Sequence, residues 1–503
     1  MAAEHRIQAV RTLGMAMARR FCSSAVTGTA RKEEKKNLYR RLSGLKKDPN
    51  GSVEETMSGW LREGEVVTES QLTTIVRELR RYKNYNHALQ VTDWMENKGM
   101  EITFGTHAVR IDLLAKVKGV DASERYFSSL PEPAKNQKTY GALFNVYCQE
   151  KMADKVISLH EKMKELNLAS STLVSNNLMT LHMKLGHPEK VPEHFEEMKA
   201  ANISPDKVTY GLLMNSYASM KDIESVERVV EEMKGGQVAM DWSTYCNLAF
   251  YYNSAGLFEK ADSALKSAER VMKRHDRDPY DHLLTLYAAA GNLAEVNRIW
   301  KLLKSSFKVI TNMNYLSMFT ALRKLGDTDG LKQCFQEWES VYVTYDIRLV
   351  NVVIDAYLTV DMVDEALALW EKAKEKGVRS DFKTLELFAE YFMERRDISS
   401  VLKFLELMAG LVKPKGFKAN KERMTAFLKH LEEVKDVDAA EGLCRHMKKL
   451  ECLNAEAYES LLRTYLAAGR KGSHLGERIK EDGIETSPET EKLLERVCAI
   501  VKI

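Results

Sequence analysis

Residues 172–206 read TLVSNNLMTLHMKLGHPEKVPEHFEEMKAANISPD, and this stretch of 35 residues decides the fold. Its first half places apolar residues three and four positions apart, and a second such series follows Gly186. That spacing is typical of amphipathic helices, so the stretch predicts two short helices separated by a turn. One pair of helices cannot bury both of its apolar faces, and neighbouring copies must therefore pack against it.

The same pattern recurs along most of the chain. When the Thr-Tyr phrases at 139–140, 209–210 and 244–245 are aligned, units begin at residues 69, 104, 137, 172, 207, 242, 277, 312, 347, 382 and 421, and a partial unit begins at 455. Eight of the eleven spacings are 35 residues, and the others are 33, 39 and 34. Chance does not produce such a period. We therefore predict an all-α fold, a right-handed α-solenoid of about eleven helix-turn-helix repeats of 35 residues.

The break between the two helices of a unit falls near its fifteenth residue. Glycine often stands there, so we expect hairpin turns near Gly186, Gly256, Gly291 and Gly326. The second helices carry recurrent methionine and aromatic residues at helical spacing. We interpret these stripes as the core that runs along the stack, and not as a cofactor site.

Composition excludes several classes of protein. A chain of 503 residues is too long for one hydrophobic core, which agrees with a repeat array. No apolar run is long enough to span a bilayer, so we expect no membrane segment. The seven cysteines are odd in number and form no C-x-x-C pair, which argues against both a disulfide framework and a zinc site.

The N-terminal segment differs from the rest. The first 32 residues hold six basic residues and one acid, Glu4, with apolar residues on one helical face. This composition is typical of an organellar presequence, and Arg19-Arg20-Phe21 predicts mitochondrial cleavage after Phe21. We therefore divide the chain into a mitochondrial presequence (1–21), a basic segment with an N-terminal capping helix (22–68), the eleven repeats (69–454), and a partial repeat with a C-terminal capping helix (455–503). Import into the chloroplast is the alternative.

Two units carry a family resemblance. The unit 172–206 has residues of the family consensus at Asn176, Leu178, Gly186, Phe195, Met198, Pro205 and Asp206. The unit 347–381 has consensus residues at Asn351, Ile354, Glu365, Ala366, Leu369, Gly377 and Asp381. The chain thus resembles the pentatricopeptide repeat family, in its plain 35-residue class of plant organelles, from residue 69 to about residue 470. Tetratricopeptide repeats instead need glycine at the eighth position, where this chain has bulky residues such as Phe144 and Met179.

The resemblance implies an RNA-binding surface. In the family, the fifth and last residues of each repeat face one RNA base. Three pairs match those the family uses: Asn176 with Asp206 and Asn351 with Asp381, both for uracil, and Thr425 with Asn454, for adenine. Other fifth positions cannot make a polar side-chain contact or would repel phosphate. These are Ala108, Gly141, Gly211, Cys246, Leu316, Asp281 and Glu386.

Basic residues provide candidates for contacts with the RNA backbone. The thirteenth position of the family repeat often carries lysine, and here it holds Arg81, Lys116, Lys184 and Lys324. The segment 31–47 adds Arg40, Arg41, Lys46 and Lys47. The chain has a net charge of +3, and the mature chain would be close to neutral. Since phosphate contacts supply most non-specific affinity, we expect free RNA to bind weakly.

No arrangement typical of an enzyme is found. A deaminase tail would need His-x-Glu and Cys-x-x-Cys, and the segment after residue 430 has neither. We expect no cofactor, no metal and no small-molecule substrate. Two functions remain open. One is binding of single-stranded RNA in transcript processing, stability or translation, in the mitochondrial matrix or else the chloroplast stroma. The other is an architectural role in an assembly such as the mitochondrial ribosome, with ribosomal RNA and ribosomal proteins as partners.

Overall fold

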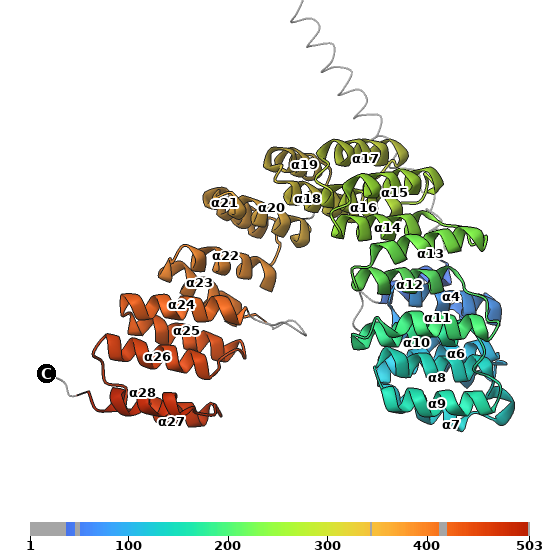
Figure 1. The fold of residues 1–503 in the computed structure, drawn as a ribbon, viewed down its shortest axis with the longest axis horizontal. Coiled ribbons are helices and arrows are strands. Elements are labelled where there is room, and N and C mark those ends of the chain that lie inside the picture. Colours follow the sequence, from blue (N-terminus) through green and yellow to red (C-terminus); the bar gives the residue numbers. More distant parts are fainter. Residues whose placement is uncertain (1–36, 46–50, 343–344, 412–419, 501–503) are drawn as a thin grey trace, which may run out of the picture. The chain divides into compact units, whose positions relative to one another are not determined.

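The computed structural model describes residues 37–45, 51–342, 345–411 and 420–500 (Figure 1). The predicted presequence 1–21, as well as Lys46 and Lys47, lies outside the described residues. Every regular element within the described ranges is helical, and none is a strand. No described helix combines the length and apolar character that crossing a membrane requires.

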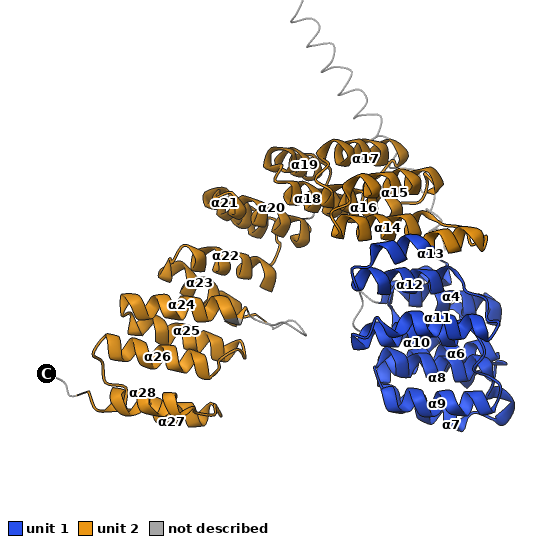
Figure 2. Ribbon diagram, in the orientation of Figure 1, with its two compact units in different colours: residues 1–229 blue, residues 230–503 orange. Residues whose placement is uncertain are grey.

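The chain forms two compact units, residues 1–229 and 230–503 (Figure 2). Unit 1 contains α2 (Leu38–Gly44), α3 (Val53–Arg62), α4 (Glu69–Arg81), α5 (Tyr85–Asn97), α6 (Phe104–Lys118), α7 (Val120–Ser129), η2 (Glu132–Ala134), α8 (Gln137–Gln149), α9 (Ala153–Glu165), α10 (Thr172–Leu185), α11 (Lys190–Ala200) and α12 (Lys207–Ser219). Helix α13 (Ile223–Gly235) contains the boundary between the units.

Unit 2 continues the same alternation of first and second helices. It contains α14 (Trp242–Ser254), α15 (Phe258–Val271), α16 (Asp278–Ala289), α17 (Leu293–Ser306), α18 (Asn312–Leu325), α19 (Thr328–Val341), α20 (Ile347–Thr359), α21 (Val363–Glu375), α22 (Phe382–Glu394), α23 (Ile398–Ala409), α24 (Lys421–Val434), α25 (Val437–Lys449), α26 (Ala455–Ala467), α27 (Leu475–Glu481) and α28 (Pro488–Cys498). First helices begin at the predicted first residue of each repeat, except α16, whose N-cap is Arg277. The all-α solenoid of helix-turn-helix repeats is thus confirmed.

The last residue of a repeat starts the first helix of the next. Asp206, for example, is the N-cap of α12, and its side chain accepts from the backbone N–H of Thr209. Thr68, Thr103, Asn136, Ser171, Asp241, Thr311, Asp346, Asp381, Asn420 and Asn454 cap their helices in the same way. Such a cap is worth about 1 kcal/mol, so the capping requirement alone favours Asp, Asn, Ser or Thr at this position.

Left-handed residues end the first helices where the sequence predicted turns. Gly186 and Gly326 are C-caps with φ of 81° and 71°, and Gly256 and Gly291 follow one residue after the cap with φ of 73° and 75°. Glycine has no Cβ, so it adopts this conformation without steric cost. The chain can then reverse and place the second helix against the first.

The core lies between the stacked helices, as the stripes predicted. Met163 and Met198 on second helices are buried, and so are the bulky residues Phe144 and Met179 at the eighth position of first helices. A tetratricopeptide glycine at that position would leave a void here, because the neighbouring helices stand far enough apart to hold a large side chain.

Both ends hold more helix than the sequence indicated. Two helices, α2 and α3, precede the repeats where one was expected, and their residues Leu42 and Met57 are fully buried. At the other end, α27 precedes the last helix, α28. The two glycines near its start weakened the helical pattern, but Gly476 permits close packing. A Cβ there would lie 3.1 Å from Cδ2 of Leu494 on α28.

Candidate RNA interface

Asn176 and Asp206 are brought together, as the sequence predicted. Asn176 is the fifth residue of α10, and its Nδ2 donates to Oδ1 of Asp206 at 3.1 Å. The hydroxyl of Thr209 on α12 lies 2.8 Å from Oδ1 of Asn176 and 2.9 Å from Oδ1 of Asp206. Asn176 is only 7% exposed and Thr209 is fully buried. These contacts fix the orientation of the amide, so the pair is preorganised.

The carboxylate of this pair is held in its ionised form. Burial by itself would raise the pKa of Asp206, but hydrogen bonds from the backbone N–H and hydroxyl of Thr209 and from the amide of Asn176 outweigh it and lower the pKa. The amide has a second N–H, and the carboxylate has a second oxygen, with the backbone N–H of Val208 as a further donor to this group. A donor beside an acceptor matches the edge of uracil, where an N–H lies next to a carbonyl oxygen.

Unit 2 contains a second copy of this arrangement. Nδ2 of Asn351 donates to Oδ1 of Asp381 at 3.0 Å, and the hydroxyl of Thr384 donates to Oδ1 of Asn351 at 2.7 Å. Asn351 is 8% exposed and Thr384 is fully buried. In hydrogen bonding and burial, this triad matches that of unit 1.

The third predicted pair is not joined in the same way. Asn454 caps α26 by accepting from the N–H of Ala457 at 3.0 Å. Thr425 is buried on α24. Within the described part of the chain, no hydrogen bond links these two side chains. The structure thus places the pair on neighbouring first helices without fixing a donor beside an acceptor.

Sequence reasoning missed the threonine that completes each triad. Its signal was present for Thr209, which belongs to the Thr-Tyr phrase that fixed the repeat register, whereas Thr384 is followed by Leu385. The phrase was used only to align the repeats. Asp241 and Thr244 form the same contact at 3.0 Å, but Gly211 provides no amide to complete a triad there.

Apolar side chains flank the triad of unit 1, and the sequence analysis did not single them out. Leu173 and Val208, the second residues of α10 and α12, are 57% and 54% exposed. Leu173 reaches across the fifth position of the preceding repeat, since its Cδ2 lies 3.7 Å from the place of a Cβ on Gly141. Val208 holds the corresponding position on α12, so the repeat geometry predicts that it lies beside Asn176. Exposed aliphatic groups on both sides of a polar pair can hold the faces of a planar base.

The triad of unit 2 has charged flanks instead. Arg348 and Lys383 occupy the positions of Leu173 and Val208. Arg348 pairs with Asp346 at 2.7 Å, and Lys383 pairs with Glu386 at 2.7 Å. The two triads are therefore alike in their hydrogen bonds and different in their surroundings.

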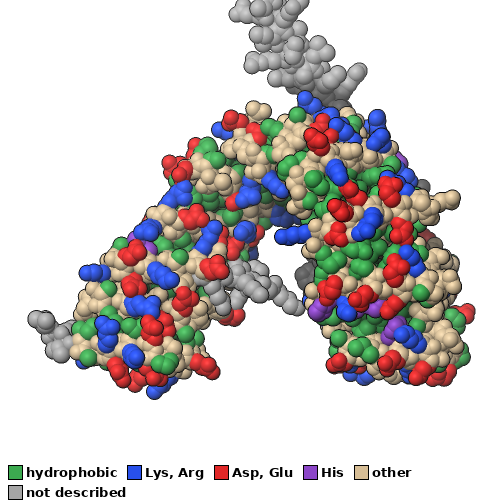
Figure 3. Space-filling view, viewed as in Figure 1, with side chains coloured by type: hydrophobic (Ala, Val, Ile, Leu, Met, Phe, Trp, Pro, Cys, Tyr) green, Lys and Arg blue, Asp and Glu red, His purple; other side chains and the backbone are tan. Residues whose placement is uncertain are grey.

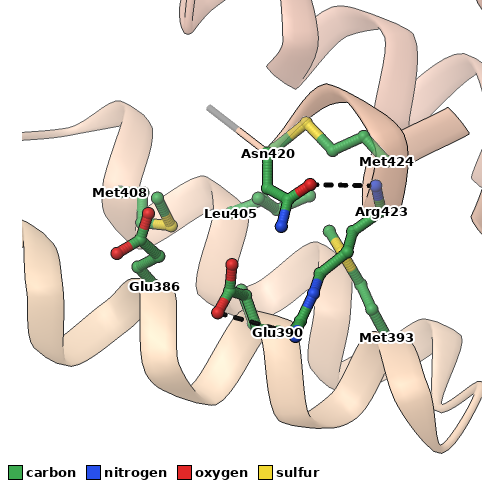
Figure 4. Close-up of a pocket in the computed structure, with 9 residues that line it drawn as sticks. Glu386, Glu390, Met393, Leu405, Met408, Asn420, Arg423 and Met424 are labelled. Carbon is green, nitrogen blue, oxygen red and sulfur yellow. Dashed lines mark hydrogen bonds and ion pairs between the residues drawn. The ribbon is translucent and has the colours of Figure 1, made fainter. Parts of the chain in front are cut away.

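Acidic residues at two other fifth positions in unit 2 already accept hydrogen bonds from neighbouring side chains. Asp281 accepts from Nδ2 of Asn314 at 3.0 Å, and burial raises the pKa of its carboxyl. Glu386 lines a shallow pocket with Asn420, over a floor that includes Met393, Leu405, Met408 and Met424. Figure 4 shows Asn420 capping α24 through the N–H of Arg423, whose guanidinium reaches back to Glu390. The fifth and last residues of this repeat therefore have separate partners.

Some of the basic residues predicted to contact the RNA backbone are exposed, and others are already paired with a neighbouring side chain. Arg81 and Lys324 are exposed, whereas Lys116 pairs with Asp112 at 2.7 Å and Lys184 donates to the side chain of Gln149. At the N-terminal end, Arg40 is exposed and Arg41 pairs with Glu63 at 2.6 Å. Basic and acidic side chains are interspersed over both units on the face drawn in Figure 3.

The cysteines are arranged as packing residues. Burial raises the pKa of Cys148, Cys246 and Cys334 to about 12, so these thiols stay protonated and unreactive. No group of three His, Cys, Asp or Glu side chains in the described ranges is placed to hold a metal ion.

Comparison with known proteins identifies the repeats. A family model described as PPR repeat family matches residues 170–219, and one described as PPR repeat matches residues 138–168, 208–238 and 349–378. A mitochondrial pentatricopeptide repeat-containing protein of Arabidopsis thaliana is 39% identical over 495 residues, covering 96% of this chain and 98% of the relative. Large ribosomal subunit protein mL101 of Arabidopsis thaliana is 38% identical over 491 residues, covering 96% and 99%.

A solved structure was also matched. The crystal structure of the pentatricopeptide repeat protein PPR10 from maize covers 96% of this chain and 73% of its own, at 16% identity and a TM-score of 0.49. The family models together with relatives similar over nearly their whole length are decisive. This chain belongs to the pentatricopeptide repeat family.

Proposed function

We propose that this protein binds RNA in mitochondria and that unit 1 reads a uracil through Asn176 and Asp206. The observation that carries the proposal is the preorganised triad with Thr209, flanked by the exposed apolar residues Leu173 and Val208. Burying a fixed donor and acceptor between two apolar walls discriminates between bases, because a wrong base leaves both groups unpaired.

The predicted presequence and the names of the relatives support a mitochondrial place of action. Two relatives are named as mitochondrial pentatricopeptide repeat-containing proteins, and residues 1–21 have the composition of an import signal. We place the mature protein in the matrix, with residues 22–68 and 455–503 as caps of the repeats 69–454. It acts by binding and not by catalysis. Fusion of residues 1–40 to a reporter tests the location, and a chloroplast signal would contradict it.

An architectural role in the mitochondrial ribosome is the second candidate. It is favoured by the similarity to mL101, a large ribosomal subunit protein, over nearly the whole of both chains. The scarcity of base-reading sites also fits this role, since a fifth-position Asn bonded to a last-position Asp occurs in two repeats among the described residues. Ribosomal RNA and ribosomal proteins would then be the partners.

One experiment separates the two candidates. Mitochondrial extracts are sedimented in high salt, with the protein detected across the gradient. A ribosomal component should remain with the large particle. A transcript-binding factor should stay near the top and should select uridine-containing RNA from a pool, and this selection should be lost in Asn176→Ala. Random selection by the wild-type chain would contradict base reading.

A further inference from the structure

Three hairpin turns of unit 1 hold lysine where the backbone is left-handed. Lys83, Lys151 and Lys221 follow the C-caps of α4, α8 and α12, with φ of 56°, 58° and 61°. This conformation is sterically unfavourable for a residue with a Cβ. At the corresponding turns, glycine stands at Gly186 in the same unit and at Gly256, Gly291 and Gly326 in unit 2, whereas Asp361, Arg396 and Lys435 occupy three other turns of unit 2. Glycine would thus suit these three turns better than lysine does.

Contacts within the molecule do not account for the lysines. All three are exposed, and among the described residues their ammonium groups have neither a hydrogen-bond partner nor an ion-pair partner. Their side chains therefore stabilise neither the turn nor the packing of the repeats. A role outside the molecule remains, and the charge is the feature that glycine would not supply.

Further cations lie at the same ends of the first helices, and we define the turn-lysine edge by Arg81, Lys83, Lys116, Lys118, Lys151, Lys184 and Lys221. The first helices α8, α10 and α12 lie one above the other in Figure 1. Contacts between repeats join their ends. Asp112 accepts from both Arg80, at 2.8 Å, and Lys116, while Lys184 lies 3.4 Å from the carbonyl oxygen of Gln149.

Three carboxylates lie near this edge, and one of them, Asp112, pairs with Lys116. Asp222 caps the next helix by bonding the N–H and hydroxyl of Ser225, and Glu150 is exposed. The edge therefore presents one or two cations from each of five successive repeats, at the spacing of packed helices, about 8–10 Å. Lys116 and Lys184 are held by Asp112 and Gln149, and the other members of the edge are exposed. A row of cations from successive repeats suits a polymer with regularly spaced negative charge.

We propose that the turn-lysine edge binds the phosphate backbone of RNA, as a contact separate from the base-reading triad. The inference rests on the proposed RNA binding and adds a second surface to it. Lysine ammonium groups on flexible side chains accept phosphates in many positions, so this contact is independent of sequence and sensitive to salt. An acidic protein segment is the other polyanion that could lie here.

The test is the triple variant Lys83→Gly, Lys151→Gly, Lys221→Gly of the full-length chain. Glycine relieves the left-handed backbone, so the melting temperature should stay the same or rise. The slope of log affinity against log salt should fall by about 2 to 3, and affinity near 50 mM salt should drop roughly tenfold or more. Loss of binding together with retained stability cannot be explained by unfolding.

Lys435→Gly is the matched control. Lys435 stands at the corresponding turn of unit 2 with φ of 60° and is exposed. One positive charge, against three in the triple variant, is removed from the same backbone conformation, and RNA binding should not change. An equal loss in this control would overturn the assignment to the edge of unit 1.

The probes are an RNA duplex of about 16 base pairs, a single-stranded uridine-rich RNA of similar length, and polyglutamate. A reduced salt slope on either RNA supports the proposal and tells whether paired or single-stranded backbone lies on the edge. Unchanged slopes on both RNAs overturn it, whatever happens with polyglutamate. Asn176→Ala is measured in parallel, so that loss of base reading and loss of the edge are told apart.

Discussion

The two units contain the same hydrogen-bonded triad in different surroundings. Asn176 and Asn351 each donate to an aspartate and accept from a buried threonine, at distances that agree within about 0.1 Å. The flanking residues are exposed and apolar in unit 1, whereas in unit 2 they are cations held by Asp346 and Glu386. A matching pair of residues therefore does not by itself define a base-reading site.

Charge on the first helices follows the same division. Lys138, Lys184 and Lys207 are the charged residues of α8, α10 and α12, so each of these helices is positive. In unit 2, α22 carries one lysine and three glutamates, and α18 carries two basic residues and no acid. Because RNA is a polyanion, a base is held more readily where the surrounding helices attract its phosphates. We therefore expect unit 1 to do most of the RNA binding.

The largest expected effect is on RNA affinity. Asn176→Ala should weaken binding to a uridine-containing RNA by about 1–3 kcal/mol, since it removes the donor to the base edge. Asn351→Ala should have a smaller effect, because that triad lacks apolar walls. Fluorescence anisotropy with labelled single-stranded RNA measures both. Equal losses in the two variants would show that the flanking residues do not matter.

Stability should respond equally in the two units. Thr209→Val and Thr384→Val keep the shape of the side chain but leave the amide oxygen of a buried asparagine without its donor. Each should lower the free energy of unfolding by about 1–2 kcal/mol. Chemical denaturation compares the two variants. A clear difference between them would mean that the triads are not equivalent, and the comparison of affinities would then need another explanation.

Exchange of the flanking residues tests the cause of the asymmetry. In the double variant Arg348→Leu, Lys383→Val, unit 2 acquires the walls of unit 1, and Asn351→Ala should then cost roughly 1 kcal/mol more than in the wild-type background. A double-mutant cycle by anisotropy gives this difference directly. A coupling near zero would assign the asymmetry to the charge of the helices and not to the walls.

The fold was predictable from the sequence because the recurring pattern fixes the residue at which each repeat begins. The first residue of nearly every first helix follows from the Thr-Tyr phrase and the period of 35 residues. The meeting of Asn176 with Asp206 followed from the family pattern. The sequence could not separate capping from base reading at the last position, because both need a small polar acceptor such as Asp206 or Asn454.

The side-chain contacts around the base-facing pairs were harder to predict than the pairs themselves. Whether Arg348 is free or held by Asp346 depends on side-chain contacts that the repeat pattern does not encode. The same is true of Lys116, which was predicted to be a backbone contact and pairs with Asp112. The sequence shows that Lys151 stands at a predicted turn. Its left-handed backbone conformation becomes evident only in the folded chain.

The smallest expected effect concerns Asp281, the acidic fifth residue in unit 2. Burial raises the pKa of its carboxyl, an effect that hydrogen bonds from Asn314 and Ser317 only partly offset. A raised carboxyl pKa means that the folded chain binds the proton more tightly than the unfolded chain does. The ionised form therefore costs stability at neutral pH, and this cost disappears as the pH falls below the unfolded value of about 3.9.

Asp281→Asn removes the buried charge and keeps an oxygen that accepts from Asn314. We expect a slightly higher melting temperature than that of the wild type at pH 7 and no difference near pH 3.5. Asp278→Asn is the control, because this exposed carboxylate lies in the first turn of α16, where negative charge is favourable. Its removal should lower the melting temperature slightly at pH 7. If both variants shift in the same direction, the burial of Asp281 does not determine its effect on stability.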